Sequence, residues 1–470
     1  MEQRVGIARG GVTFVEVAQS FCSGESRMWI DLILPSALPY VVTGLWLAIG
    51  RALIGVIVAE FFTAFAGPGN LIVTNANSFR TDRTFVPILL MALLGITPTA
   101  RLEWAERKVV RWAAKDSSMR RPVRRLRTAL AALAVAGMLA GCGAFGDSPS
   151  QGSEPRPEGQ AIRVGLPTGV TSFANADLAV AIEKGFLSEV GLTVETQNLR
   201  SGVSVVQGVV GGALEIGASS IEPVVNAAAG GGDVVIIGAY TDKLTVSAVA
   251  PAAVQTAADL RGRQVGVQEV GAFREVMTRL VLQSAGLTQN DVQYIPVDAQ
   301  SYNSALVDGR IQNAILQTEQ AIAVQRDNPG MHSIAELANV VPDYHYGTFF
   351  VSRAWLQANR DVAVKFLTAM TRAHRFMYEN KDETVKIVAK TTEFDEQVIS
   401  QAYDSLLGQQ GVFPVNTGLD KARIKKTINR MRELGILENE PPVYEQLVDA
   451  GPIIDAVDSL GVQTGDARWR

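Results

Sequence analysis

The pattern of apolar and polar positions divides the 470-residue chain into three stretches, and the first is membrane-like. Residues 38–67 are apolar almost throughout, with Arg51 and Glu60 as their charged positions. A second uncharged stretch lies between Arg83 and Arg101, and a helix of this length reaches roughly 25 Å, at the short end for a membrane span. The pattern predicts an α-helical membrane segment over residues 1–118, with about two transmembrane helices. Two buried helices of a soluble domain are the alternative.

Charge favours the membrane interpretation. Ten Lys and Arg residues lie between Arg101 and Arg127, against three acidic residues, so this run carries +7 in a chain whose net charge is −4. A basic run of this kind can bind nucleic acid, but here it lies between two apolar stretches. Under the positive-inside rule it is better explained as a cytoplasmic flank. We therefore expect no nucleic-acid partner.

The second stretch, residues 119–142, has the organisation of a signal peptide. A basic start is followed by an uncharged apolar run over residues 128–140, which is too short for a comfortable transmembrane helix. The run ends in Leu139-Ala140-Gly141-Cys142, which resembles the bacterial lipobox. That resemblance implies that Cys142 is lipidated and becomes the mature N-terminus, with residues 143–160 as a flexible tether. An unreactive cysteine in an Ala-rich helix is the alternative.

The third stretch, residues 161–470, predicts an α/β fold. Short apolar runs alternate with helical patterns such as 178–184 and 221–229, and a second round of the same kind follows. The two rounds are alike: GGALEIGASSIEPVV aligns loosely with DGRIQNAILQTEQAI. Two such rounds and a helical tail suggest two similar lobes around a cleft, with ligand-binding loops beyond the carboxyl ends of the strands.

Several sequence motifs of this stretch resemble one protein family. They are Ala179–Gly185, Gly191–Val194, Gly212–Gly217 and Asp259–Val267. In this order they resemble the periplasmic binding proteins of the nitrate/sulfonate/taurine/thiamine-precursor group. The resemblance implies a two-lobed, type II venus-flytrap fold with hinges near residues 244–251 and 346–352. Lobe one would comprise residues 161–251 and 346–470, and lobe two residues 252–345.

The first stretch resembles the C-terminal third of a binding-protein-dependent permease of the same importer class. Glu16, Ala18 and Pro35 match the permease loop that docks on a separate ATPase subunit, whereas Cys22 replaces the family's glycine. About half or more of such a permease would lie upstream, so we expect this segment not to transport by itself. A genuine fusion of permease and binding protein and a merger of two adjacent genes both remain open, with the merger slightly favoured.

Residues at predicted strand ends are the candidates for ligand binding, although some, such as Thr171 and Ser220, also suit helix N-caps. The candidates are Thr171, Ser172, Phe173, Asn175, Ser219, Ser220, Glu222, Tyr240, Glu269, Gly271, Phe273, Gln317, Glu319 and Tyr346. Three carboxylates in a dry cleft disfavour an anionic solute, and aromatic side chains suit a flat ring. The expected ligand is therefore a pyrimidine-like thiamine precursor or another nitrogen heteroaromatic compound. An aliphatic sulfonate, taurine or nitrate is the alternative.

The remaining chemistry of the sequence does not favour an enzyme. The chain has two cysteines and three scattered histidines, so no metal site or cofactor is expected. It contains no nucleophile elbow, zinc-protease helix or phosphate-binding loop motif. A pyrimidine-precursor synthase is a possible relative, but such an enzyme would be cytosolic, contrary to the export signal. A sensor or adhesin is a further alternative. We expect an extracytoplasmic lipoprotein that binds a small solute for an importer.

Overall fold

The computed structural model describes residues 48, 85–89, 160–167, 172–199, 201–268, 270–297, 301–437 and 439–466. Residues 48 and 85–89 are helical, and no helix within the described part of the chain is both long and apolar enough to cross a membrane. The predicted signal peptide with Cys142, and the docking-loop residues Glu16, Ala18 and Pro35, lie outside the described residues. Residues 157–470 fall within one compact unit of the chain.

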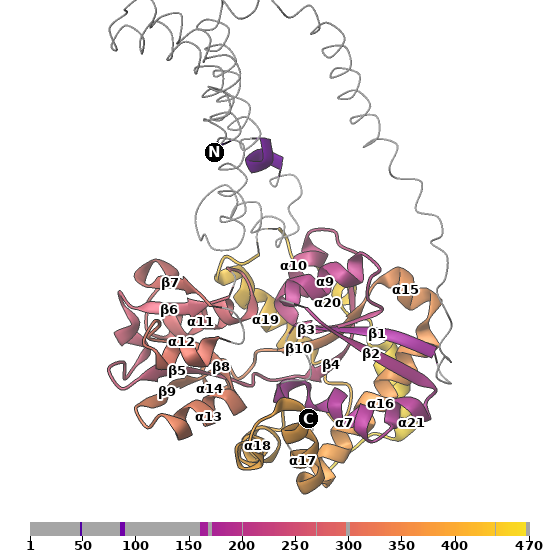
Figure 1. Cartoon of the computed structure of the whole chain (residues 1–470). Coiled ribbons are helices and arrows are strands. Elements are labelled where there is room, and N and C mark those ends of the chain that lie inside the picture. The colour runs from indigo at the N-terminus through magenta and orange to yellow at the C-terminus, as the bar shows by residue number, and fades with distance from the viewer. Residues whose placement is uncertain are drawn as a thin grey trace, which may run out of the picture. The chain divides into compact units, whose positions relative to one another are not determined.

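Lobe one is built on a five-stranded sheet with the order β2-β1-β3-β10-β4 (Figure 1). Its strands are β1 (Gln160–Leu166), β2 (Leu192–Asn198), β3 (Ile216–Ser220), β4 (Val235–Thr241) and β10 (Gly347–Val351). β1 runs parallel to β2 and β3, whereas β10 is antiparallel to β3 and β4. Every residue of β3, β4 and β10 is buried, so these three strands lie inside lobe one.

Lobe two repeats this arrangement. Its strands are β5 (Val246–Pro251), β6 (Gln264–Val267), β7 (Gln293–Pro296), β8 (Ala314–Gln317) and β9 (Met331–Glu336). β8, β5 and β9 form one ladder, β6 pairs in parallel with β7, and a bridge between Val265 and Asn313 joins the two parts. The resulting order, β7-β6-β8-β5-β9, matches that of lobe one, with the fourth strand antiparallel in both lobes.

Two crossings of the chain join the lobes. After β4 the chain passes into lobe two, where β5 pairs between β8 and β9. After β9 it returns to lobe one, where β10 pairs between β3 and β4. We define the lobes by their sheets, so that lobe two starts at Val246. The crossings are then residues 242–245 and 341–346, and they place the ends of β4 and β10 beside the lobe interface.

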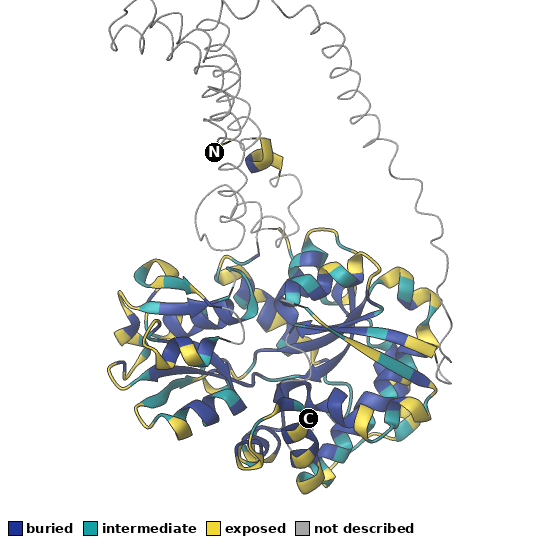
Figure 2. Cartoon of the chain, in the orientation of Figure 1, coloured by how far each residue is buried: buried dark blue, intermediate teal, exposed yellow. Residues whose placement is uncertain are grey.

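Helices cover both sheets, and their apolar faces make up most of the buried core (Figure 2). In lobe one they are η4 (Phe173–Asn175), α7 (Ala176–Glu183), α8 (Phe186–Glu189), α9 (Gly202–Val210) and α10 (Ile221–Ala229). In lobe two they are η5 (Ala257–Leu260), α11 (Phe273–Ser284), η6 (Gln289–Asp291), α12 (Tyr302–Val307), α13 (Thr318–Asp327) and α14 (Leu337–Val340).

The C-terminal region after β10 is helical, as the sequence predicts. It comprises α15 (Arg353–Ala358), α16 (Arg360–Glu379), α17 (Lys381–Thr392), α18 (Glu396–Tyr403), η7 (Asp404–Gln410), α19 (Lys421–Glu433), α20 (Tyr444–Leu447) and α21 (Gly451–Leu460). The longest of these, α16, buries a stripe at helical spacing that includes Val362, Phe366, Met370 and Met377. Lys243 of the first crossing donates to the carbonyl oxygens of Gln410 and Gly411, so this region also fixes the hinge.

Candidate functional site

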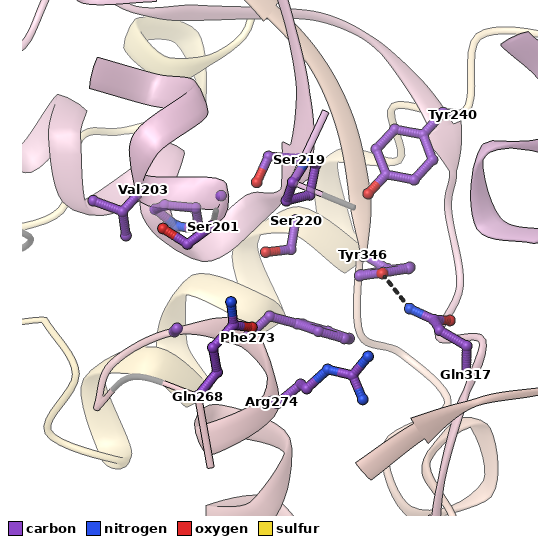
Figure 3. A pocket seen from close by; sticks show the side chains of 14 residues that line it. Ser201, Val203, Ser219, Ser220, Tyr240, Gln268, Phe273, Arg274, Gln317 and Tyr346 are labelled. Atoms are coloured by element: carbon purple, nitrogen blue, oxygen red, sulfur yellow. Dashed lines mark hydrogen bonds between the residues drawn. The ribbon is translucent and has the colours of Figure 1, made fainter. Parts of the chain in front are cut away.

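A cavity of about 60 Å³ lies where the two lobes and the second crossing meet (Figure 3). It is lined by Pro167, Ser201, Gly202, Val203, Ser219, Ser220, Pro223, Tyr240, Gln268, Ala272, Phe273, Arg274, Gln317 and Tyr346. The three serines lie on one side of the cavity, and Gln268, Phe273 and Arg274 lie on the opposite side. Both lobes therefore contribute to one site.

The lobe-one wall presents hydroxyl groups and the start of two helices. Ser201 is the N-cap of α9 and accepts a hydrogen bond from the Ser204 amide, and Ser220 precedes α10. Ser219 Oγ is buried without a hydrogen-bond partner among the described residues. A Cβ on Gly202 would lie 2.2 Å from this oxygen, so the glycine leaves room for the hydroxyl. Hydroxyl groups beside helix N-termini suit an anion.

The lobe-two wall contains a buried cation, Arg274 in the first turn of α11. The residue is 7% exposed. Its guanidinium donates to the Ile315 carbonyl oxygen and lies 4.4 Å over the centre of the Tyr302 ring. These contacts hold the planar group beside the cavity. Its positive charge also acts on the buried Glu319 carboxyl group of α13.

Aromatic side chains close the cavity at the hinge. The rings of Phe273 and Tyr346 are stacked with centroids 4.5 Å apart, and Tyr240 meets Tyr346 edge-on at 5.9 Å. Gln317 donates to the Tyr346 hydroxyl at 3.1 Å and accepts from the Thr245 hydroxyl at 2.7 Å, so one side chain touches both crossings. Burial raises the pKa of Tyr346 to about 12, and that of Tyr240 well above its usual value. Both phenols are neutral at physiological pH.

The structure divides the candidates from the sequence into two groups. Those that line the cavity are Ser219, Ser220, Tyr240, Phe273, Gln317 and Tyr346. Those placed elsewhere are Ser172, Phe173, Asn175, Glu222, Gly271 and Glu319, and two further candidates, Thr171 and Glu269, lie outside the described residues. Ser201, Gln268 and Arg274 are lining residues that sequence reasoning missed. Ser201 carried a usable signal, since a serine before an apolar helical pattern predicts an N-cap.

The two described acids from the sequence lie inside the protein rather than at the cavity. Glu222 is fully buried and accepts a hydrogen bond of 2.6 Å from the Tyr344 hydroxyl. Glu319 is also buried and accepts from the Ser172 hydroxyl and the Phe173 amide. Burial raises the pKa of both carboxyl groups. The acidic cleft on which the heteroaromatic ligand was expected is therefore not formed by these two residues.

Comparison with known protein families identifies two regions. Residues 172–384 match the family described as NMT1/THI5 like, and residues 12–111 match the binding-protein-dependent transport system inner membrane component. The chain thus carries an NMT1/THI5-like domain and a permease segment, as the sequence motifs predict. A putative binding protein of Brucella abortus is 28% identical over 221 residues, 46% of this chain and 68% of that protein.

The permease segment has relatives of its own. A putative aliphatic sulfonates transport permease of Escherichia coli is 36% identical over 98 residues, which are 21% of this chain and 37% of that protein. A formylaminopyrimidine transport permease of Halalkalibacterium halodurans is 29% identical over 103 residues, 22% of this chain and 41% of that protein. The chain therefore spans about two fifths of the length of these permeases.

Solved structures confirm the predicted periplasmic-binding-protein fold. The alkanesulfonate-binding protein of Xanthomonas axonopodis pv. citri superposes with a TM-score of 0.53 and 16% identity, over 63% of this chain and all of that one. The nitrate-binding protein of Synechocystis PCC 6803 gives 0.52 and 14%, over 66% of this chain and 91% of that one. At these identities the likeness shows the fold.

Proposed function

We propose that residues 161–470 are the substrate-binding component of an ABC importer and that they capture a small solute carrying an oxyanion group. The observation that carries this proposal is that one cavity is lined by buried Arg274 and by the Ser219 hydroxyl, which has no hydrogen-bond partner within the described part of the chain. A guanidinium group and hydroxyl donors that face one cavity suit the coordination of a sulfonate or nitrate-like group. The names of the sulfonate- and nitrate-binding proteins that share the fold support the same class.

The cavity size limits what binds in this conformation. Small-molecule sites usually occupy roughly 300–1,000 Å³, whereas this cavity measures about 60 Å³. It has room for a compact anionic group, and a larger solute requires the lobes to move apart before they close over it. Capture then depends on closure, with Gln317 and Tyr346 at the hinge side of the site.

The aromatic side chains do not form an open slot for a flat ring. The rings of Phe273 and Tyr346 contact each other directly, with centroids 4.5 Å apart. A ring inserted between them would need a separation of about 7 Å, since each stacked contact takes about 3.5 Å. A pyrimidine-like ligand would therefore have to separate the two side chains, whereas an oxyanion leaves them in contact.

Titration calorimetry on the full chain in detergent tests the solute class, with ethanesulfonate, nitrate and an aminopyrimidine as separate ligands. We expect binding of an oxyanion, weakened at least tenfold in Arg274→Gln because the buried charge is lost. Arg279→Gln is the matched control, since Arg279 lies on the same helix but pairs with Glu275. Tight aminopyrimidine binding that Arg274→Gln leaves unchanged would overturn the oxyanion proposal.

The N-terminal stretches support a proposal for the location of the binding domain and for its partners. We propose that residues 119–142 direct export and that Cys142 anchors the binding domain outside the cytoplasm. The permease segment would then contact a separate ATPase through the loop with Glu16, Ala18 and Pro35, and the chain would bind its solute without transforming it. Mass spectrometry of the protein from native membranes tests the anchor: a lipidated N-terminus at Cys142 is expected, and an unprocessed chain would contradict it.

A further inference from the structure

Two buried carboxylates occupy equivalent positions in the two lobes. Glu222 is the second residue of α10, after β3, and Glu319 is the second residue of α13, after β8. The internal sequence repeat aligns the same two positions. Both residues are at most 1% exposed, and each has one oxygen, Oε2, without a hydrogen-bond partner among the described residues. The lobes thus carry a matched pair of buried acids.

The two acids accept hydrogen bonds from different parts of the molecule. Glu222 Oε1 accepts from the Tyr344 hydroxyl on the second crossing. Glu319 Oε1 accepts from the Ser172 hydroxyl at 3.0 Å and the Phe173 amide at 3.2 Å, and both donors belong to lobe one. Glu319 therefore forms hydrogen bonds from lobe two to the body of lobe one.

Contacts within each lobe fix the donors at the start of η4 and the acceptor in α13. Ser172 is the N-cap of η4 and also accepts from the Ala174 amide, and the buried Phe173 ring packs against Phe413. On the other side, the amide of Gln317 donates to the side chain of Gln320, which fixes the first turn of α13. An opening motion that moves the start of α13 away from η4 therefore breaks both hydrogen bonds to Glu319.

We propose that Glu319 is a latch between the lobes, which stabilises their closed arrangement and slows release of the bound solute without lining the cavity. The consequence for release rests on the proposed function, whereas the latch itself does not. A buried donor that loses its acceptor is costly, so opening is penalised by the Ser172 hydroxyl and the Phe173 amide together. Glu319 is a positioning residue in this scheme, because it acts on the solute through closure.

Hydrogen exchange of the full chain tests the latch without any solute. In Glu319→Met the Phe173 amide should exchange at least tenfold faster than in the wild type, because its acceptor is gone. Glu222→Met is the matched control: it removes an equally buried acid whose partner lies on the crossing, and it should leave Phe173 exchange unchanged. Glu319→Gln keeps an acceptor oxygen and should restore slow exchange if Glu319→Met folds poorly.

Solute release is measured in the same variants by surface plasmon resonance with the oxyanion that calorimetry identifies. Glu319→Met should raise the dissociation rate about tenfold and leave the association rate nearly unchanged. Unchanged exchange at Phe173, or equal acceleration in Glu222→Met, would overturn the latch. Faster exchange with an unchanged dissociation rate would overturn its effect on release. Failure of every oxyanion to bind the wild type would contradict the proposed function alone.

Discussion

Replacing Gly347 by alanine tests the packing that positions the site. Gly347 is the first residue of β10, directly after the second crossing, and it pairs with Ser220 and Thr241. A Cβ added here would lie 2.4 Å from Cζ of Tyr240 and 2.7 Å from Oγ1 of Thr241. Unstrained carbon contacts lie near 3.5 Å, so the ring or the strand has to shift by about 1 Å.

The Tyr240 ring cannot move freely. It is 3% exposed and packs between Tyr346, at 5.9 Å, and Phe349, at 5.7 Å between ring centres. Overpacking of a rigid core typically costs about 1–3 kcal/mol, so we expect Gly347→Ala to lower the free energy of unfolding by about 2 kcal/mol. Since Tyr240 also lines the cavity, solute affinity should fall in the same variant.

Urea denaturation followed by circular dichroism measures the effect, and Gly330→Ala is the control because its Cβ would meet no atom within 4 Å. The midpoint should fall in Gly347→Ala with an unchanged m-value, and it should stay near the wild-type value in Gly330→Ala. Tyr240→Ala should cost less stability in the Gly347→Ala background than in the wild type. Equal midpoints for the two alanine variants would refute the packing argument.

Three further predictions concern stability. Burial lowers the pKa of His345 from 6.5 to about 3, so the unfolded chain takes up a proton at a higher pH than the folded protein does. In urea titrations the free energy of unfolding of the wild type should therefore fall as the pH decreases from about 6.5 to 3, by at most about 5 kcal/mol. A His345→Leu variant should lack this component. Burial raises the pKa of Asp242 from 3.8 to about 6, so the folded protein loses stability as the pH rises through this range. Asp242→Asn should therefore stabilise the protein at pH 8 by at most about 3 kcal/mol in urea titrations, and the gain should vanish below pH 4. Ser201→Ala should cost about 1 kcal/mol in thermal melts through loss of the α9 cap, and an unchanged melting temperature would contradict that role.

The sequence predicts the elements of this fold better than their pairing. The apolar runs of β3 and β4 identify the strands, and the repeat identifies two lobes. The insertion of β10 between those strands is not predictable from periodicity, because its partners lie more than 100 residues upstream. Only the three-dimensional structure brings these distant segments together.

The candidate site shows a more specific limit of sequence reasoning. Ser220 and Gln317 lie at the ends of β3 and β8, as the sequence predicts, and both line the cavity. Glu222 and Glu319 lie two residues further on, and a helix turns about 200° over that distance, so they point into the protein. Arg274 was missed because an arginine on an amphipathic helix looks solvent-exposed in the sequence. Its burial depends on Tyr302 and Ile315, which later segments supply.

The exchange of β5 and β10 between the lobes also determines the order in which the chain can fold during synthesis. All strands of lobe two, Val246–Glu336, precede β10 in the chain, so this lobe can complete its sheet as soon as they leave the ribosome. Lobe one must wait, since β3 and β4 are separated by the position that β10 fills. Until Val351 has been synthesised, two fully buried strands of lobe one present unpaired edges, and such edges promote aggregation. The nascent chain is therefore most vulnerable while its second lobe is finished and its first is not.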